Sequence, residues 1–137
     1  MPGLDRFVEA QARDWNTALA ELRAGSKHSH WMWYIFPQIA GLGRSPAAQF
    51  YAIADRTEAR AYLAHPLLGP RLQEASDAIL GWAGQRGATE ILGGIDAAKL
   101  RSSMTLFEAA GGDDRFAAVL DRCYQGERDE RTLALLG

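Results

Sequence analysis

The sequence has one cysteine and no long apolar run. Cys123 has no second cysteine with which to form a disulfide, so a disulfide-stapled secreted domain is excluded and a reducing compartment is expected. The longest apolar stretch, residues 31–36, is six residues long, whereas a membrane-spanning helix needs about 20. The N-terminal segment carries charges every few positions and contains no signal-peptide core. We therefore expect a cytoplasmic protein that has no membrane partner.

The chain also lacks a basic patch. Its 15 lysines and arginines are dispersed and are outnumbered by 17 acidic residues, for a net charge of −2, so nucleic acid is not an expected partner. Lysine itself is scarce, because all basic residues except Lys27 and Lys99 are arginines. In such a chain a lysine can mark a position that needs a compact ammonium group, although chance is the simple alternative.

Motifs of several enzyme classes are absent. The three histidines, His28, His30 and His65, do not have the spacing of a zinc site, and there is no HExxH or GxSxG motif. Residues 41–45 begin like a phosphate-binding glycine loop but complete neither the GxGxxG pattern nor the GK[ST] ending. We predict no metal and no cofactor, and the sequence leaves open whether the chain is an enzyme.

The residues that are present predict an all-α fold. At 137 residues, with 47% apolar and 23% charged residues, the chain has the composition of one globular domain spanning residues 1–137. Apolar positions three and four apart predict a helix over residues 5–23, closed by Gly25. Capping residues, among them Ser45, Asp55 and Asp129, delimit the others together with prolines and glycine pairs. We expect a single compact, irregular array of about six to eight helices.

Two stretches of this pattern are less regular. Residues 29–36 are rich in strand-forming aromatics, but without a second strand to pair with they are predicted to form a short buried helix, with a strand as the alternative. Residues 89–92 are predicted to form a turn before the Gly93–Gly94 break, after which Asp96 caps the next helix.

The densest chemistry lies in residues 26–45. Lys27, His28 and His30 precede Trp31 and Trp33 within seven residues, which joins cations to large flat surfaces. This combination predicts a pocket in which an aromatic face binds a ring and the cations bind phosphate or carboxylate. The predicted ligand-binding residues downstream in the segment are Gln38 and Arg44. The alternative is that the aromatic rings belong to the core and the histidines satisfy buried backbone groups.

A second candidate group lies further along the chain. Lys99, Ser102 and Ser103 are three and four residues apart, so they meet on one face of a helix. They can bind phosphate, or the lysine can activate a serine, and the alternative is a set of solvated polar residues. We predict that Lys27, His30 and Lys99 face one cavity, with His30 and Lys99 as the candidate catalytic residues.

Several runs of the chain resemble an uncharacterised bacterial family of the domain-of-unknown-function type, whose members often carry a legacy label that names calpastatin. The matching runs are residues 7–11, 29–38, 41–43, 65–72 and 102–107. The resemblance implies a compact all-helical fold and brings no established activity or residue set. Inhibition of the calpastatin type resembles a disordered chain that folds onto a protease, whereas this composition is that of a preformed globule, so protease inhibition is not expected.

Two functions follow as hypotheses. The first is binding of, and possible action on, a small anionic metabolite such as a nucleotide or a sugar phosphate, using the residues named above. The alternative is a protein-interaction or scaffold module in which Trp31, Trp33 and Phe36 form an exposed aromatic patch. The oligomeric state is left open by the sequence.

Overall fold

The structure, a computed structural model, describes residues 3–137, and within this range it contains nine helices and no β-strand. None of these helices is both long and apolar enough to cross a membrane. The predicted all-α class is confirmed, although the described residues form one helix more than the upper end of the predicted range. The helices are α1 (Asp5–Ala24), α2 (Met32–Ile35), α3 (Pro46–Phe50), α4 (Arg56–Ala64), α5 (Leu68–Leu80), α6 (Ala88–Leu92), α7 (Gly94–Ala109), α8 (Asp114–Cys123) and α9 (Glu130–Leu136).

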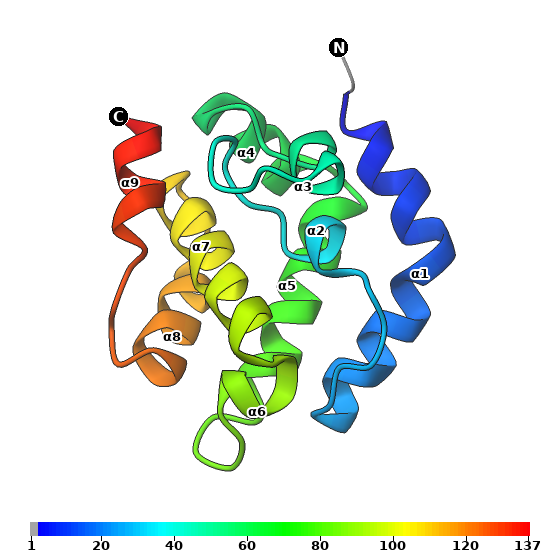
Figure 1. Cartoon of the computed structure of the whole chain (residues 1–137), viewed down its shortest axis with the longest axis vertical. Helices are drawn as coiled ribbons and strands as arrows, with labels where there is room; N and C mark the ends of the chain where they lie inside the picture. The colour runs from blue at the N-terminus through cyan, green and yellow to red at the C-terminus, as the bar shows by residue number, and fades with distance from the viewer. Residues whose placement is uncertain (1–2) are drawn as a thin grey trace.

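Helix α7 lies at the centre of the array. It contacts α4, α6, α8 and α9, while α5 contacts α1, α4 and α8. Figure 1 shows α7 and α5 between α1 at one edge of the molecule and α8 and α9 at the other. Leu100, Met104 and Phe107 are buried on one face of α7, and Thr105 and Leu106 are buried on its other sides. Residues 102–107 of α7 are all buried, and a helical segment covered on all sides combines apolar and small polar residues in this way.

Most predicted helix ends are confirmed. The side chains of Ser45, Asp55 and Asp129 each accept a hydrogen bond from a backbone N–H in the first turn of the following helix, which satisfies a donor that the helix itself cannot. Gly25 closes α1 with a left-handed backbone, φ 72°.

The two less regular stretches, residues 29–36 and 89–92, both contain short helices, of which only the first was predicted. Residues 89–92, predicted as a turn, lie in α6, and this is the additional helix. Gly93 ends α6 with φ 88°, and α7 begins directly at Gly94, so the prediction that Asp96 caps α7 is wrong. Residues 29–36 contain the short helix α2, three of whose four residues are buried.

The chain after α2 is fixed by a single β-bridge. Ile39 and Ile53 form an isolated parallel bridge, in which the Ile53 N–H donates to the Gln38 carbonyl at 2.8 Å. The bridge ties the segment before α3 to the segment after it. The loop that carries α3 therefore lies in a defined position over the front of the array (Figure 1).

Gly69 in α5 lies where a side chain would collide with α4. A Cβ added at Gly69 would lie 2.2 Å from the Leu63 carbonyl oxygen. Because backbone does not move aside cheaply, we expect Gly69→Ala to lower the free energy of unfolding by about 1–3 kcal/mol. The control is Gly81→Ala, at φ −60° with its nearest contact at 3.5 Å, which should be neutral or slightly stabilising. Urea unfolding measures both variants, and equal effects would contradict this packing argument.

Candidate functional site

The segment between α1 and α2 is held by the carboxylate of Glu21. Its Oε1 accepts the backbone N–H groups of His28 and Ser29 at 2.8 and 2.9 Å and the Trp31 indole N–H at 3.0 Å. Its Oε2 accepts the Ser29 hydroxyl at 2.6 Å. Four donors from a segment without regular structure thus converge on one side chain, which fixes the direction in which this segment enters the core.

These hydrogen bonds change the acidity of Glu21. Burial alone would raise its pKa, but the hydrogen bonds from the Ser29 side chain, from the backbone of His28 and Ser29 and from the Trp31 indole outweigh burial and lower the pKa to about 2. The carboxylate is therefore ionised throughout the physiological range, as its role as a multiple acceptor requires.

The segment held by Glu21 brings Lys27 to the start of α7. The Lys27 backbone N–H donates to the Ile91 carbonyl at 2.8 Å, and its Nζ lies 2.8 Å from Asp96 Oδ2 with only 9% of the side chain exposed. Lys99 Nζ lies 3.3 Å from Asp96 Oδ1. The predicted convergence of the two lysine segments is confirmed, and Asp96 is the residue that joins them.

A cavity of about 340 Å³ opens beside this cluster, a size at the lower end of the range for small-molecule sites. We call it the lysine cavity. Two tryptophan rings accompany the lysines, since Lys27 Nζ lies 5.1 Å from the Trp31 ring centroid and Lys99 Nζ lies 4.7 Å from that of Trp33. The lining residues come from the segment before α2, from α2 and from the junction of α6 and α7: Lys27, His30, Met32, Trp33, Leu92, Gly93, Gly94, Ile95, Asp96 and Lys99.

The lysine cluster carries excess positive charge. Burial would raise the pKa of Asp96, but the ammonium groups of Lys27 and Lys99 outweigh it and hold that pKa below its ordinary value. Asp96 is therefore ionised, and one carboxylate serves two ammonium groups. The sequence did contain a signal for this residue, because Asp96 precedes Lys99 by three positions on one helix.

Six of the ten predicted ligand-binding residues do not line the lysine cavity, namely His28, Trp31, Gln38, Arg44, Ser102 and Ser103. His28 is exposed, with its Nε2 3.2 Å from the Ser26 hydroxyl. Arg44 is exposed in the loop before α3. Gln38 lines a neighbouring cavity instead. Residues close in sequence diverge here because α2 and the bridge after it turn the chain away from His30.

The candidate nucleophiles are separated from one another. The Ser102 hydroxyl lies 3.0 Å from Asp129 Oδ2, and Ser103 is fully buried. Lys99 points to Asp96 and Trp33, so the lysine and serine side chains do not form the predicted group. Cys123 is half-buried, and burial raises the pKa of its thiol, which disfavours the reactive thiolate.

The histidines are not gathered either. His65 Nδ1 accepts the backbone N–H groups of Leu67 and Leu68 at 3.1 and 3.2 Å, at the start of α5, while His28 and His30 lie before α2. Within residues 3–137, no three His, Cys, Asp or Glu side chains form a group that could hold a metal ion.

The predicted exposed aromatic patch does not form. Trp31 exposes 1% of its surface and Phe36 none, so both rings belong to the core and only Trp33 of the three is partly exposed. The buried Trp31 ring therefore has no free face on which the ring of a ligand could stack. Its indole packs into the core and its N–H donates to Glu21. Their burial follows from α2, which packs against α1.

A family model matches residues 2–136, that is, almost the whole chain. The chain belongs to the DUF1810 family. The description of this family is "protein of unknown function". The family assignment confirms the resemblance found in the sequence, whereas the description contains nothing about calpastatin.

A solved structure agrees with the assignment. The chain is similar to the conserved hypothetical protein Rv1873 from Mycobacterium tuberculosis, known from a crystal structure, with 49% identity and a TM-score of 0.94 over 97% of this chain and 95% of that one. No curated protein matches the chain. The relatives thus support the fold, while the chemistry of the site must be argued from its own side chains.

The four hydrogen bonds to Glu21 lead to a prediction about pH. We expect Glu21→Gln to lower the free energy of unfolding by about 1–3 kcal/mol at pH 7, because an uncharged amide has one acceptor oxygen for four donors. The folded-state pKa is lowered from 4.5 to about 2, so the stabilisation is present above pH 4.5 and is lost as pH falls toward 2. Urea unfolding at several pH values should show the difference between wild type and variant shrinking over this interval.

The matched control for this experiment is Glu74→Gln. Glu74 pairs with Arg23 at 2.9 Å, but both side chains are about half exposed or more, so the pair contributes little. A difference between wild type and Glu21→Gln that stays constant from pH 5 to pH 2 would contradict the assigned role of the carboxylate.

Proposed function

We propose that the chain binds a small anionic metabolite, of the nucleotide or sugar-phosphate class, in the lysine cavity. The observation that carries this proposal is the shared use of Asp96 by Lys27 and Lys99 at the cavity wall. Two ammonium groups with one carboxylate between them leave a positive charge for which a bound anion is the natural partner.

The burial of Lys27 favours a second anionic partner for its ammonium group. An ammonium group removed from water is costly unless its donors are satisfied. Asp96 Oδ2 takes one of the three donors of Lys27. A phosphate or carboxylate in the cavity would accept further charge-assisted hydrogen bonds from Lys27 and Lys99 together. The first turn of α7 adds its backbone N–H groups at Gly94, where the lack of a side chain leaves open space.

The apolar part of the cavity favours a ligand that also has a ring. Trp33 borders the cavity and is partly exposed, with Met32 and Leu92 beside it. An aromatic face next to ammonium groups suits a nucleobase joined to phosphate, because the ring stacks while the charge is neutralised.

Binding is a better description of the site than catalysis. Asp96 is ionised and paired with both lysines, so it has no proton to donate. The Ser102 hydroxyl donates a hydrogen bond to Asp129 and is not positioned as a nucleophile next to a base in the lysine cavity. His30 lines the cavity and is exposed, and it is the side chain we would assign as acid or base if the ligand is transformed. The scaffold alternative has no observation in its favour, since its aromatic patch is absent among the described residues.

The test is a thermal-shift screen followed by calorimetric titration with adenosine 5′-monophosphate (AMP) and glucose 6-phosphate. We expect at least one of them to raise the melting temperature, and Lys99→Gln to weaken its binding by about tenfold or more. Arg23→Gln removes the same charge from an exposed ion pair of α1 outside the cavity and should leave binding unchanged.

Tryptophan fluorescence provides a second readout. Binding should change the emission of the wild type, and Trp33→Phe should remove most of that change, because Trp33 is the tryptophan that lines the cavity. The proposal is overturned if no nucleotide or sugar phosphate raises the melting temperature, or if Lys99→Gln and Arg23→Gln bind equally well.

A further inference from the structure

A second cavity of about 380 Å³ adjoins the lysine cavity. It lies between α7, the start of α9 and the loop that joins α2 to α3. Trp33 and Lys99 line both cavities, so this stacked pair stands at the boundary between them. We call the second cavity the arginine cleft, after Arg101 and Arg131 in its wall.

The charges of the arginine cleft are poorly balanced. Its lining includes Lys99, Arg101 and Arg131, against one carboxylate, that of Asp129. The Asp129 Oδ2 atom already accepts the Thr132 backbone N–H at 3.2 Å as the cap of α9, and the Ser102 hydroxyl lies 3.0 Å from it. Among the described residues this carboxylate caps α9 and forms no ion pair with Arg101 or Arg131, so one negative charge stands against three positive charges in the lining.

The two arginines retain donors for a ligand. Arg101 Nη1 lies 3.4 Å from Glu127, a mostly exposed side chain, and such a surface pair is weak. Arg101 Nε is buried without a hydrogen-bond partner within residues 3–137, so a ligand would contact the exposed third of this side chain and not Nε itself. The Arg131 side chain is exposed and forms no hydrogen bond or ion pair with any other residue of the described chain. A guanidinium with unused donors is suited to phosphate.

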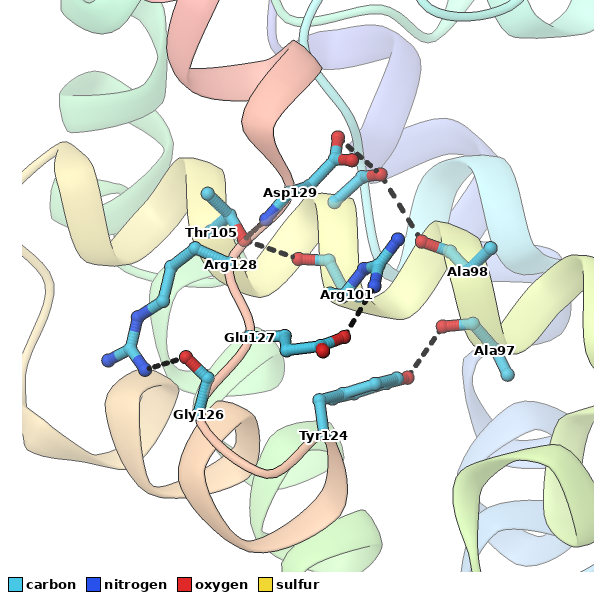
Figure 2. Close-up of polar contacts among 10 residues, drawn as sticks. Ala97, Ala98, Arg101, Thr105, Tyr124, Gly126, Glu127, Arg128 and Asp129 are labelled. Carbon is cyan, nitrogen blue, oxygen red and sulfur yellow. Dashed lines mark hydrogen bonds and ion pairs between the residues drawn. The ribbon is translucent and has the colours of Figure 1, made fainter.

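The cleft is also rigidly built. Figure 2 shows Arg101 on α7 beside the segment that leads through Glu127 into α9. The Asp129 N–H donates to the Thr105 hydroxyl at 3.0 Å, and that hydroxyl donates to the Arg101 carbonyl at 2.8 Å. These bonds fasten the start of α9 to α7, so the backbone of Arg131 is fixed relative to α7, from which Arg101 and Lys99 extend.

We propose that the ligand is a nucleotide with two separated phosphate groups, which spans both cavities across the Trp33–Lys99 pair. One phosphate lies at Lys27 and Lys99 in the lysine cavity, and the other lies at Arg101 and Arg131 in the arginine cleft. This inference rests on the proposed function and specifies the class of ligand that the same site selects.

The experiment compares three probes by calorimetric titration. They are AMP, with one phosphate, adenosine 5′-diphosphate (ADP), whose second phosphate is attached to the first, and adenosine 3′,5′-bisphosphate, whose phosphates lie on opposite sides of the ribose. We expect the bisphosphate to bind about tenfold more tightly than AMP or ADP, because it alone places charge in both cavities. ADP serves as the control for added charge.

The matched variants are Arg131→Gln and Arg122→Gln. Arg131→Gln should abolish the advantage of the bisphosphate and leave AMP binding unchanged. Arg122 is exposed on α8 and lines neither cavity. Arg122→Gln should therefore change neither the affinity for AMP nor the affinity for the bisphosphate. Melting temperatures of both variants check that the fold is intact.

The possible results separate this inference from the proposed function. If ADP binds as tightly as the bisphosphate, or if Arg131→Gln weakens AMP and the bisphosphate equally, the two-cavity ligand is wrong while nucleotide binding in the lysine cavity stands. If the bisphosphate depends on Arg131 but not on Lys99, both the spanning ligand and the proposed function are wrong. If none of the probes binds, both are overturned.

Discussion

The ionised carboxylate of Glu21 is the interaction on which the site depends. The segment after α1 has no helix or strand of its own to satisfy its backbone, and Glu21 accepts four of its donors. Only with that segment in place does Lys27 reach the start of α7 and Trp31 enter the core. The site is therefore built from α1 outward, by a residue that does not touch the cavity.

The second constraint on the site is the carboxylate of Asp96, whose negative charge lets two ammonium groups lie close together. Two ammonium groups placed together would repel each other, and Asp96 between them makes their approach favourable while leaving one charge uncompensated. In the proposed site this arrangement holds both lysines ready before the anion arrives. A ligand then gains two charge-assisted contacts without the entropic cost of ordering two long side chains.

The sequence predicted local features well and distant ones poorly. Caps such as Ser45 and Asp55, and the left-handed Gly25, depend on a few neighbouring residues, and the structure agrees with them. The lysine segments were expected to converge because their side chains could complete one anion-binding pocket, and the structure brings them together at Asp96. The two carboxylates that hold them were missed: the spacing of Asp96 and Lys99 indicates that one pair, but no spacing places Lys27 beside Asp96 or residues 28–31 beside Glu21.

One signal for Glu21 was nevertheless present. An acidic residue in the last turn of a helix is unfavourable next to the negative end of the helix dipole, and Glu21 occupies that turn of α1. Its place there suggests that its charge is used for something else. Local reasoning left open whether Trp31 and Phe36 belong to the core or to an exposed patch, because an aromatic run has the same pattern in both cases, and packing of α2 against α1 decides for the core.

The use of lysine at both positions has a physical reason. An arginine opposite Asp96 would pair with both carboxylate oxygens at once, and its fork and the carboxylate would then satisfy each other. An ammonium group bonds one oxygen and keeps donors pointing in other directions. Lys27 and Lys99 each take one oxygen of Asp96, so both can contact a further anion. In a chain whose other cations are all arginines, the proposed anion binding would account for the placement of its only two lysines through this difference between the two side chains.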